Sequence, residues 1–266
     1  MRSRAALRNR IRHLHDILRH TYGTPVREAA GDPLDELVQT ILSQNTTDAN
    51  SGAAFRRLKQ QFPTWEAVAA ARPEAIAAAI RGGGLANIKA RRIRDILREI
   101  RHRRGQLSLD FLRDLTPAAA TEFLRSFKGV GAKTAACVLL FACGMPVFPV
   151  DTHIHRVARR LGLIGERTDR EAAHEELGRS VPADLTYPFH LLMIEHGRRV
   201  CHARRPECSI CPLLRLCPTG RRQARTTSST SCYKPVTVCA VGWGENGGGR
   251  ASARVSSAHR SRPAAR

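Results

Sequence analysis

Apolar residues recur at helical spacing along most of the first two hundred positions of the chain. Leu7, Ile11, Leu14 and Leu18 follow one another at three or four residues, and Gly23 ends the run. This spacing predicts an amphipathic helix with one apolar face. The same period predicts further helices at 33–43, 49–61, 64–71, 73–81, 88–103, 110–114, 116–127, 152–161, 170–180 and 186–200. Strand-like alternation is missing before residue 218, so we expect an all-α protein.

Short polar and glycine-rich segments separate these helices and mark their ends. Asp32-Pro33 is typical of a helix start, because an aspartate caps free backbone N–H groups and proline suits the first helical turn. Thr64 and Thr116-Pro117 have the same character, and Gly82-Gly83-Gly84 ends the helix before it. After residue 218 the composition changes to Ser, Arg and Gly with few large apolar residues, so residues 219–266 are predicted to be a disordered basic tail.

A hairpin-like segment, Lys128-Gly129-Val130-Gly131, lies between two predicted helices. Its glycines permit a sharp turn and leave backbone N–H groups bare beside a helix N-terminus, an arrangement that binds phosphate. Lys133 follows in the first turn of the second helix as a candidate nucleophile, and Asp151 is a candidate to stabilise a cationic sugar. Each also has an ordinary explanation: a hairpin that only holds DNA, a solvated surface lysine, and an aspartate that caps the helix beginning at Thr152.

Four cysteines near the end of the helical part follow the spacing C-x6-C-x2-C-x5-C: Cys201, Cys208, Cys211 and Cys217. Four thiols in one short, turn-rich segment cannot lie far apart, so we expect them to share a metal. A structural zinc site is the alternative, but such sites usually pair two CxxC units that are distant in sequence. The single compact run therefore favours a [4Fe–4S] cluster. Arg204 and Arg205 lie between the first two cysteines, and this basic loop is a candidate phosphate contact.

Composition and charge narrow the class of partner. The chain of 266 residues has 44 Lys and Arg against 23 Asp and Glu, a net charge of +21, which favours nucleic acid, although a high-GC genome would also enrich Arg. No apolar run is long enough to cross a bilayer, and MRSRAALRNR lacks the apolar core of a secretory signal. We therefore expect a cytoplasmic, nucleoid-associated protein with no membrane partner. In that compartment the eight cysteines favour metal binding over disulfides.

In combination, the hairpin with Lys133, the segment Val150-Asp151-Thr152-His153-Ile154 and the four-cysteine spacing resemble endonuclease III, the iron–sulfur family of the helix-hairpin-helix DNA glycosylases. The resemblance covers about residues 7–218. It implies that Lys133 is the nucleophile, that Asp151 is the essential carboxylate and that the four cysteines hold one [4Fe–4S] cluster. The DNA contacts that it implies, together with those expected from the hairpin and the cysteine loop, are Gln44, Asn45, Leu85, Asn87, Lys89, Gly129, Val130, Gly131, His153, Arg204 and Arg205.

The chain departs from the family pattern close to the hairpin and in the loop Ser43-Gln44-Asn45-Thr46-Thr47-Asp48, which matches the family's segment that plugs the DNA helix. Phe127-Lys128 replaces the usual Leu-Pro, Ala132 replaces the usual Arg before the nucleophile, and Asn45 stands where endonuclease III has Gln. These differences bear on the preferred damaged base. Relatives specific for adenine in mismatches have Ser at the nucleophile and a further C-terminal domain, so the presence of Lys133 counts against that activity.

The resemblance implies two helical domains with a DNA cleft between them. These are a six-helix barrel with the hairpin at 33–146, and a cluster domain at 147–218 packed with the N-terminal helix at 1–32. The expected function is that of a monomeric, bifunctional DNA glycosylase and abasic-site lyase that acts on oxidised pyrimidines or abasic sites in double-stranded DNA. Two alternatives stay open: a mismatch or uracil glycosylase on the same scaffold, and a DNA-binding protein that recognises structure without catalysis.

Overall fold

The computed structural model describes residues 3–27 and 30–229, and every regular element in those ranges is helical. The prediction of an all-α fold is therefore confirmed for this part of the chain. The described residues all belong to one compact unit. None of the described helices is both long and apolar enough to cross a membrane.

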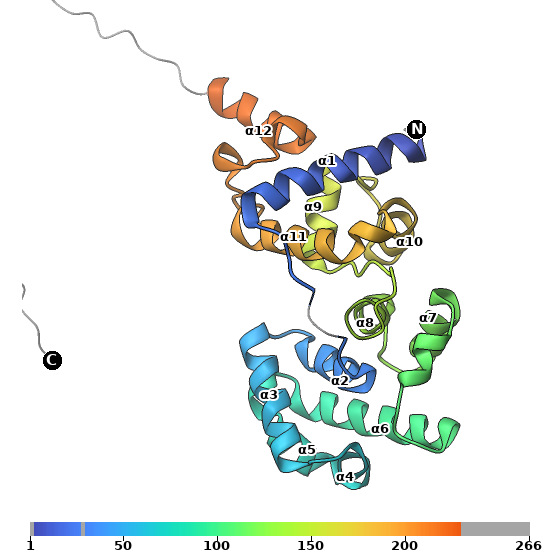
Figure 1. The fold of residues 1–266 in the computed structure, drawn as a ribbon. Coiled ribbons are helices and arrows are strands. Elements are labelled where there is room, and N and C mark those ends of the chain that lie inside the picture. The colour runs from blue at the N-terminus through green and yellow to red at the C-terminus, as the bar shows by residue number, and fades with distance from the viewer. Residues whose placement is uncertain (1–2, 28–29, 230–266) are drawn as a thin grey trace, which may run out of the picture. The chain divides into compact units, whose positions relative to one another are not determined.

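One hydrophobic cluster is built by the helices of the first half of the chain (Figure 1). Leu34, Ile41, Ile93 and Leu139 belong to it and are at most 1% exposed. The helices are α2 (Pro33–Ser43), α3 (Asp48–Gln61), α4 (Trp65–Ala70), α5 (Pro73–Ala79), α6 (Ala86–Arg104), α7 (Pro117–Arg125) and α8 (Ala132–Cys137), with 3-10 turns at Arg81–Gly83 and Asp110–Asp114.

A second hydrophobic cluster joins the N-terminal helix to the later helices (Figure 1). Leu14 of α1 packs in it with Phe148, Phe189 and Met193, all at most 2% exposed. The helices are α1 (Arg4–Tyr22), α9 (Thr152–Leu161), α10 (Arg170–Ser180) and α11 (Thr186–Arg199), with short 3-10 turns at Ala183–Leu185, Cys208–Ile210 and Leu214–Leu216. The expected domain boundaries at 33–146 and 147–218 stay a prediction, because both clusters belong to the same compact unit.

The predicted start of a disordered tail at residue 219 is wrong, because helix α12 occupies Pro218–Ser229. The last cysteine begins this helix: Cys217 Sγ accepts from the Gly220 N–H at 3.3 Å, and the Cys217 carbonyl accepts from the Arg221 N–H at 3.0 Å. The cysteine loop thus supplies the cap that the composition of the segment does not reveal. The rest of the expected tail, 230–266, lies outside the described residues.

Helix α8 ends in a π-helical turn at Val138–Ala142, where the Cys143 N–H bonds to the Val138 carbonyl at 3.2 Å. Such wide turns are rare and often occur near functional sites. The chain then crosses from the first hydrophobic cluster to the second. Lys133 therefore lies before this crossing and Asp151 directly after it.

Candidate active site

An open cavity of about 2410 Å³, counted out to its mouth, is bordered by α2 and α8 of one cluster and by the start of α9 and by α11 of the other. Lys133 and Asp151 both line it. Three of the residues predicted to contact DNA line it as well: Gln44, Asn45 and His153. The fold thus brings groups that are more than a hundred residues apart in the chain to the walls of one cavity.

Lys133 reaches the cavity from the first turn of α8 and is half-buried. One turn later, the Cys137 thiol is hydrogen-bonded to the lysine, and burial raises the pKa of this thiol to about 11. The cysteine therefore stays a neutral thiol beside the amine. Glu36 of α2 lines the same cavity; burial raises its pKa, while a hydrogen bond from the Thr40 hydroxyl at 3.0 Å and the charge of Lys133 oppose that shift.

Asp151 performs the capping role that its position before α9 predicts. Its Oδ1 accepts from the Ile154 N–H at 2.7 Å, and the half-buried side chain also faces the cavity. The capping bond holds the carboxylate in one orientation. A fixed carboxylate at the wall of a partly enclosed site is suited to stabilising positive charge on a bound sugar.

His190 of α11 belongs to this site, and the sequence gives no local signal for it. It is 2% exposed, lines the cavity and makes a 3.1 Å hydrogen bond to the Pro149 carbonyl through Nδ1. Burial lowers the pKa of His190 to about 4, against the opposing charge of Asp151. A carbonyl only accepts, so Nδ1 carries the proton of this neutral ring, and Nε2 is left as an acceptor.

The hairpin adopts the sharp turn that its glycines predict. Gly129 has φ of 88°, and a Cβ at that position would overlap the Arg92 guanidinium. Gly131 is exposed with φ of −92°, and no side chain caps the helix that follows it. Within the described ranges, the N–H groups of Gly129 and Gly131 donate to no protein acceptor, and those of the first turn of α8 precede its first bond, from Ala135 N–H to Gly131 carbonyl.

The expectation that Val130 contacts DNA is wrong for its side chain and its N–H. Val130 is 5% exposed, and its N–H donates to the Phe127 carbonyl at 3.1 Å. It packs in the first hydrophobic cluster and anchors the turn that displays its glycine neighbours.

Two loops with strained backbones lie next to each other at one edge of the cavity. Asn45 has φ of 54° and Leu85 has φ of 50°, values that non-glycine residues seldom adopt. The two loops are in contact next to Leu85: a Cβ built on Gly84 would lie 3.6 Å from the Asn45 carbonyl oxygen. Leu85 is 52% exposed, which is unusual for a leucine and suits a side chain that inserts into DNA.

Gln44 is held from two sides in the first of these loops. Its Oε1 accepts from Arg92 Nη1 at 2.7 Å, and its Nε2 donates to Thr134 Oγ1 at 3.3 Å. These bonds tie the loop after α2 to α6, behind the hairpin, and to α8, which carries Lys133. His153 is placed beside Arg156, with 3.1 Å between His153 Nδ1 and Arg156 Nη2.

Lys89 is buried, which argues against the DNA contact that the resemblance implies. It is 2% exposed and donates to the carbonyls of Leu42 at 2.7 Å and Gly83 at 2.6 Å. It joins the end of α2 to the turn before Leu85, which is a structural task. Burial and the nearby Arg92 charge lower the pKa of Lys89. Asn87, two residues earlier, is exposed and lines a groove between α6 and the hairpin.

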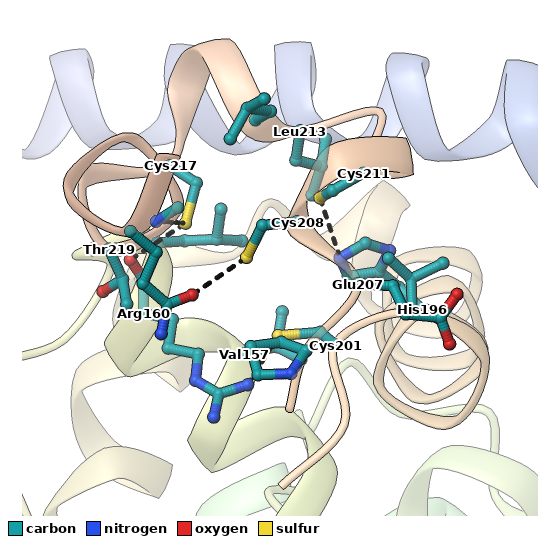
Figure 2. Close-up of a pocket in the computed structure, with 16 residues that line it drawn as sticks. Val157, Arg160, His196, Cys201, Glu207, Cys208, Cys211, Leu213, Cys217 and Thr219 are labelled. Atoms are coloured by element: carbon teal, nitrogen blue, oxygen red, sulfur yellow. Dashed lines mark hydrogen bonds between the residues drawn. The ribbon is translucent and has the colours of Figure 1, made fainter. Parts of the chain in front are cut away.

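The four cysteines of the C-x6-C-x2-C-x5-C run line one hollow of about 400 Å³ (Figure 2). None of the four forms a disulfide. Cys201 Sγ accepts from Arg160 Nη1 at 3.2 Å, and Cys217 Sγ accepts from the Gly220 N–H at 3.3 Å. Donors directed at sulfur are the surroundings that metal-bound thiolates have, so the residues fit a shared iron–sulfur group. Within the described ranges, no three such ligands are gathered tightly enough for a single metal ion.

The loop between the first two cysteines is held by hydrogen bonds from α9 and exposes basic side chains to solvent. Arg160 of α9 donates to the carbonyls of His202 at 2.7 Å and Ala203 at 3.0 Å. Arg204 and Arg205 are exposed, and Arg205 has φ of 49°. The predicted phosphate-binding loop is therefore displayed at the surface, away from the cavity that holds Lys133.

The described fold is all-helical, and Lys133 and Asp151 share one cleft beside a glycine hairpin. Together with the four-cysteine loop, these features are typical of the helix-hairpin-helix DNA glycosylases. The sequence matches the HhH-GPD superfamily of base excision DNA repair proteins over residues 38–183, which is more than half of the chain. The chain belongs to this superfamily and to its endonuclease III branch, and it is a DNA glycosylase of the endonuclease III type.

Individual relatives agree with this assignment. Endonuclease III of Thermotoga maritima is 36% identical over 194 residues, which are 73% of this chain and 86% of that protein. An Arabidopsis thaliana protein named as a DNA glycosylase is 43% identical over 62% of this chain, and the match spans 56% of that relative's length. The solved structure of a trapped covalent intermediate of endonuclease III with DNA has a TM-score of 0.70 and 29% identity, and covers 82% of this chain and 99% of its own.

Proposed function

We propose that this chain is a bifunctional DNA glycosylase and abasic-site lyase, and that it removes oxidised pyrimidines from double-stranded DNA. The observation that carries the proposal is the placement of Lys133 and Asp151 on one cavity, from helices of two different hydrophobic clusters. A structurally similar endonuclease III has been trapped as a covalent intermediate with DNA. An amine nucleophile explains such an intermediate.

Duplex DNA binds through contacts that do not depend on base sequence. The bare N–H groups of Gly129 and Gly131 face one phosphate at the start of α8, where the helix dipole favours an anion. Arg204 and Arg205 meet another stretch of the backbone. With a net charge of +21 on the chain, this binding weakens steeply as salt rises.

The damaged nucleotide leaves the base stack before any bond breaks. Leu85, Gln44 and Asn45 occupy the gap that remains in the duplex, which offsets part of the cost of unstacking. The extruded base enters the cavity bordered by α2, α8 and α11. The strained φ angles at positions 45 and 85 hold this wedge ready before DNA arrives.

Lys133 and Asp151 then divide the chemistry. As the bond between C1′ and the base breaks, the sugar gains positive charge, which the Asp151 carboxylate stabilises. The Lys133 amine supplies an electron pair to C1′, and the base leaves with the bonding pair and takes up the proton that the amine gives up. The ring oxygen then takes a proton from water as the sugar opens to a protonated Schiff base. That cation acidifies a C2′ proton, whose removal expels the phosphate on the 3′ side by β-elimination.

We include in this proposal a [4Fe–4S] cluster that Cys201, Cys208, Cys211 and Cys217 would bind. The cluster would cross-link the cysteine loop and so fix Arg204 and Arg205 against the DNA backbone. The chemistry of base removal and strand cleavage needs only the side chains of the cavity.

A panel of duplexes tests the substrate class. Each duplex carries one oxidised pyrimidine, one uracil opposite guanine, one thymine opposite guanine or one abasic site, and base release and strand cleavage are measured in EDTA. We expect cleavage at the oxidised pyrimidine and at the abasic site. Faster release of uracil or mismatched thymine would show a mismatch or uracil glycosylase instead. Binding without any base release would support a DNA-binding protein without catalytic activity.

A further inference from the structure

A short chain of polar contacts leads from the end of α1 to the cysteine hollow. The Tyr22 hydroxyl lies 2.9 Å from His196 Nδ1. His196 Nε2 lies 3.8 Å from Cys211 Sγ, the contact drawn as a dashed line in Figure 2. The proposed repair reaction uses neither the Tyr22 nor the His196 side chain.

The chemistry of the three groups fixes the direction of both hydrogen bonds. A metal-bound cysteine is a thiolate, whose sulfur only accepts, so His196 Nε2 must carry the proton. His196 is 2% exposed and no described carboxylate forms an ion pair with it, which favours the neutral ring. Nδ1 is then a lone pair, and the Tyr22 hydroxyl must be its donor.

We propose that Tyr22 and His196 form a donor relay that positions and electronically tunes the Cys211 ligand of the iron–sulfur cluster. The relay rests on the cluster proposed above. The Tyr22 hydroxyl selects the tautomer of His196, and the Nε2–H of His196 places partial positive charge at the sulfur. His196 and Tyr22 are thus positioning residues: they act on the cluster through Cys211 and touch no DNA.

The four cysteine sulfurs differ in their hydrogen-bond partners. Arg160 donates to Cys201 and the Gly220 N–H donates to Cys217, so these two sulfurs have their own donors. Cys208 lies beside the Gln223 side chain, 3.1 Å from its Oε1. Cys211 accepts from the Leu213 N–H, and among the described residues His196 is its side-chain donor. The His196 ring is held in place by Tyr22, 174 positions earlier in the chain.

Hydrogen bonds to cluster sulfurs stabilise the more reduced state, because that state carries more negative charge on sulfur. Loss of the His196 N–H should therefore move the reduction potential of the cluster to more negative values. The N–H also couples to the Fe–S(Cys) stretching vibration, so exchange into D₂O should shift a Fe–S band of the wild-type protein. A side chain that only fills space would change neither property.

The full chain of 266 residues and four variants of it test the relay after iron and sulfide content have been measured. His196→Phe should give a more negative potential and lose part of the D₂O shift. His196→Gln, which keeps an N–H donor, should lie closer to the wild type. Tyr22→Phe should shift the potential in the same direction as His196→Phe, but less. His15→Phe removes a buried histidine that contacts no cysteine in the described structure, and should leave the potential unchanged.

An unchanged potential and D₂O shift in loaded His196→Phe would overturn the relay while leaving the cluster intact. If His196→Phe does not load, the same unchanged values in loaded Tyr22→Phe would overturn it. Wild-type protein without iron and sulfide would overturn both the cluster and the relay, and would not touch the Lys133 assignment, which is tested on DNA.

Discussion

Single residues of this site carry two tasks at once, and Asp151 is the clearest case. Its carboxylate caps α9 through Oδ1 and also faces the cavity that holds Lys133. The sequence offers capping and catalysis as alternatives, whereas the structure allows both. Separating them requires a substitution that keeps one and removes the other.

Asp151→Asn is that substitution. Asparagine caps helices as well as aspartate does, so the free energy of unfolding should change by less than about 0.5 kcal/mol. Base release should slow on the order of 100-fold or more, because the charge that stabilises the sugar cation is gone. Single-turnover release and urea denaturation measure the two effects, with the α2 cap variant Asp32→Asn as the control. An equal loss of activity in both variants would remove Asp151 from the chemistry.

Lys89 illustrates a residue whose role depends on distant partners. Lys89→Met keeps most of the volume but leaves the Leu42 and Gly83 carbonyls without their donor, which should cost about 2–5 kcal/mol of unfolding free energy. The exposed Lys128→Met should cost little stability and should weaken DNA binding. Urea denaturation and binding titrations at several salt concentrations distinguish the two. If Lys89→Met kept normal stability but bound DNA more weakly, the result would support a direct contact between Lys89 and DNA.

At the scale of elements, local chemistry made the helix starts predictable. Asp32, Thr64 and Thr116 all cap the helices expected of them, because capping needs only the next two or three residues. The burial of Lys89 depends on contacts formed after folding, so the sequence did not reveal it. The cap of α12 at Cys217 is local, but cysteine is not among the usual capping residues, so it was not recognised in the sequence. His190 escaped for the same reason as Lys89: a histidine inside an amphipathic helix looks like any other until α11 is placed at the cavity.

The hairpin gives a prediction at this scale through its two glycines. Gly129→Ala forces a left-handed φ on a residue with Cβ and pushes against Arg92, so it should lower the unfolding free energy by about 1–2 kcal/mol. Gly131→Ala has φ of −92° and open space around a new Cβ, so stability should be kept. Its methyl group stands beside the bare N–H groups, and DNA affinity should fall.

Thermal unfolding and binding to an abasic-site analogue duplex measure both variants. If Gly131→Ala bound DNA as tightly as the wild type, the hairpin amides would not be the phosphate site. If Gly129→Ala were as stable as the wild type, the left-handed turn would not limit this position.

At the scale of the whole molecule, the proposed catalytic residues Lys133 and Asp151 come from two hydrophobic clusters, so conditions that loosen the contact between the clusters should affect the site. His190 lies at this junction with a pKa of about 4, against 6.5 in the unfolded chain. Between those pH values the unfolded state binds a proton that the folded state does not. The stability is therefore complete above pH 6.5 and decreases as pH falls toward 4.

The contribution of His190 to this decrease is about 3 kcal/mol at most. It is measured as the difference between wild type and His190→Gln in unfolding free energy from urea titrations across that pH range. The difference should shrink as the pH falls, because only the wild type loses this contribution. A difference that stays constant with pH would mean that His190 is not buried in its neutral form.

The central claim is that Lys133 attacks the sugar. The most direct measurement incubates the full chain with a duplex that holds one abasic site, in EDTA and borohydride, and compares wild type with Lys133→Gln. The account predicts a covalent protein–DNA adduct with the wild type, mapped to Lys133, and none with Lys133→Gln, although that variant still binds the duplex. An adduct of equal yield from Lys133→Gln, or none from wild type that binds the duplex, would contradict it.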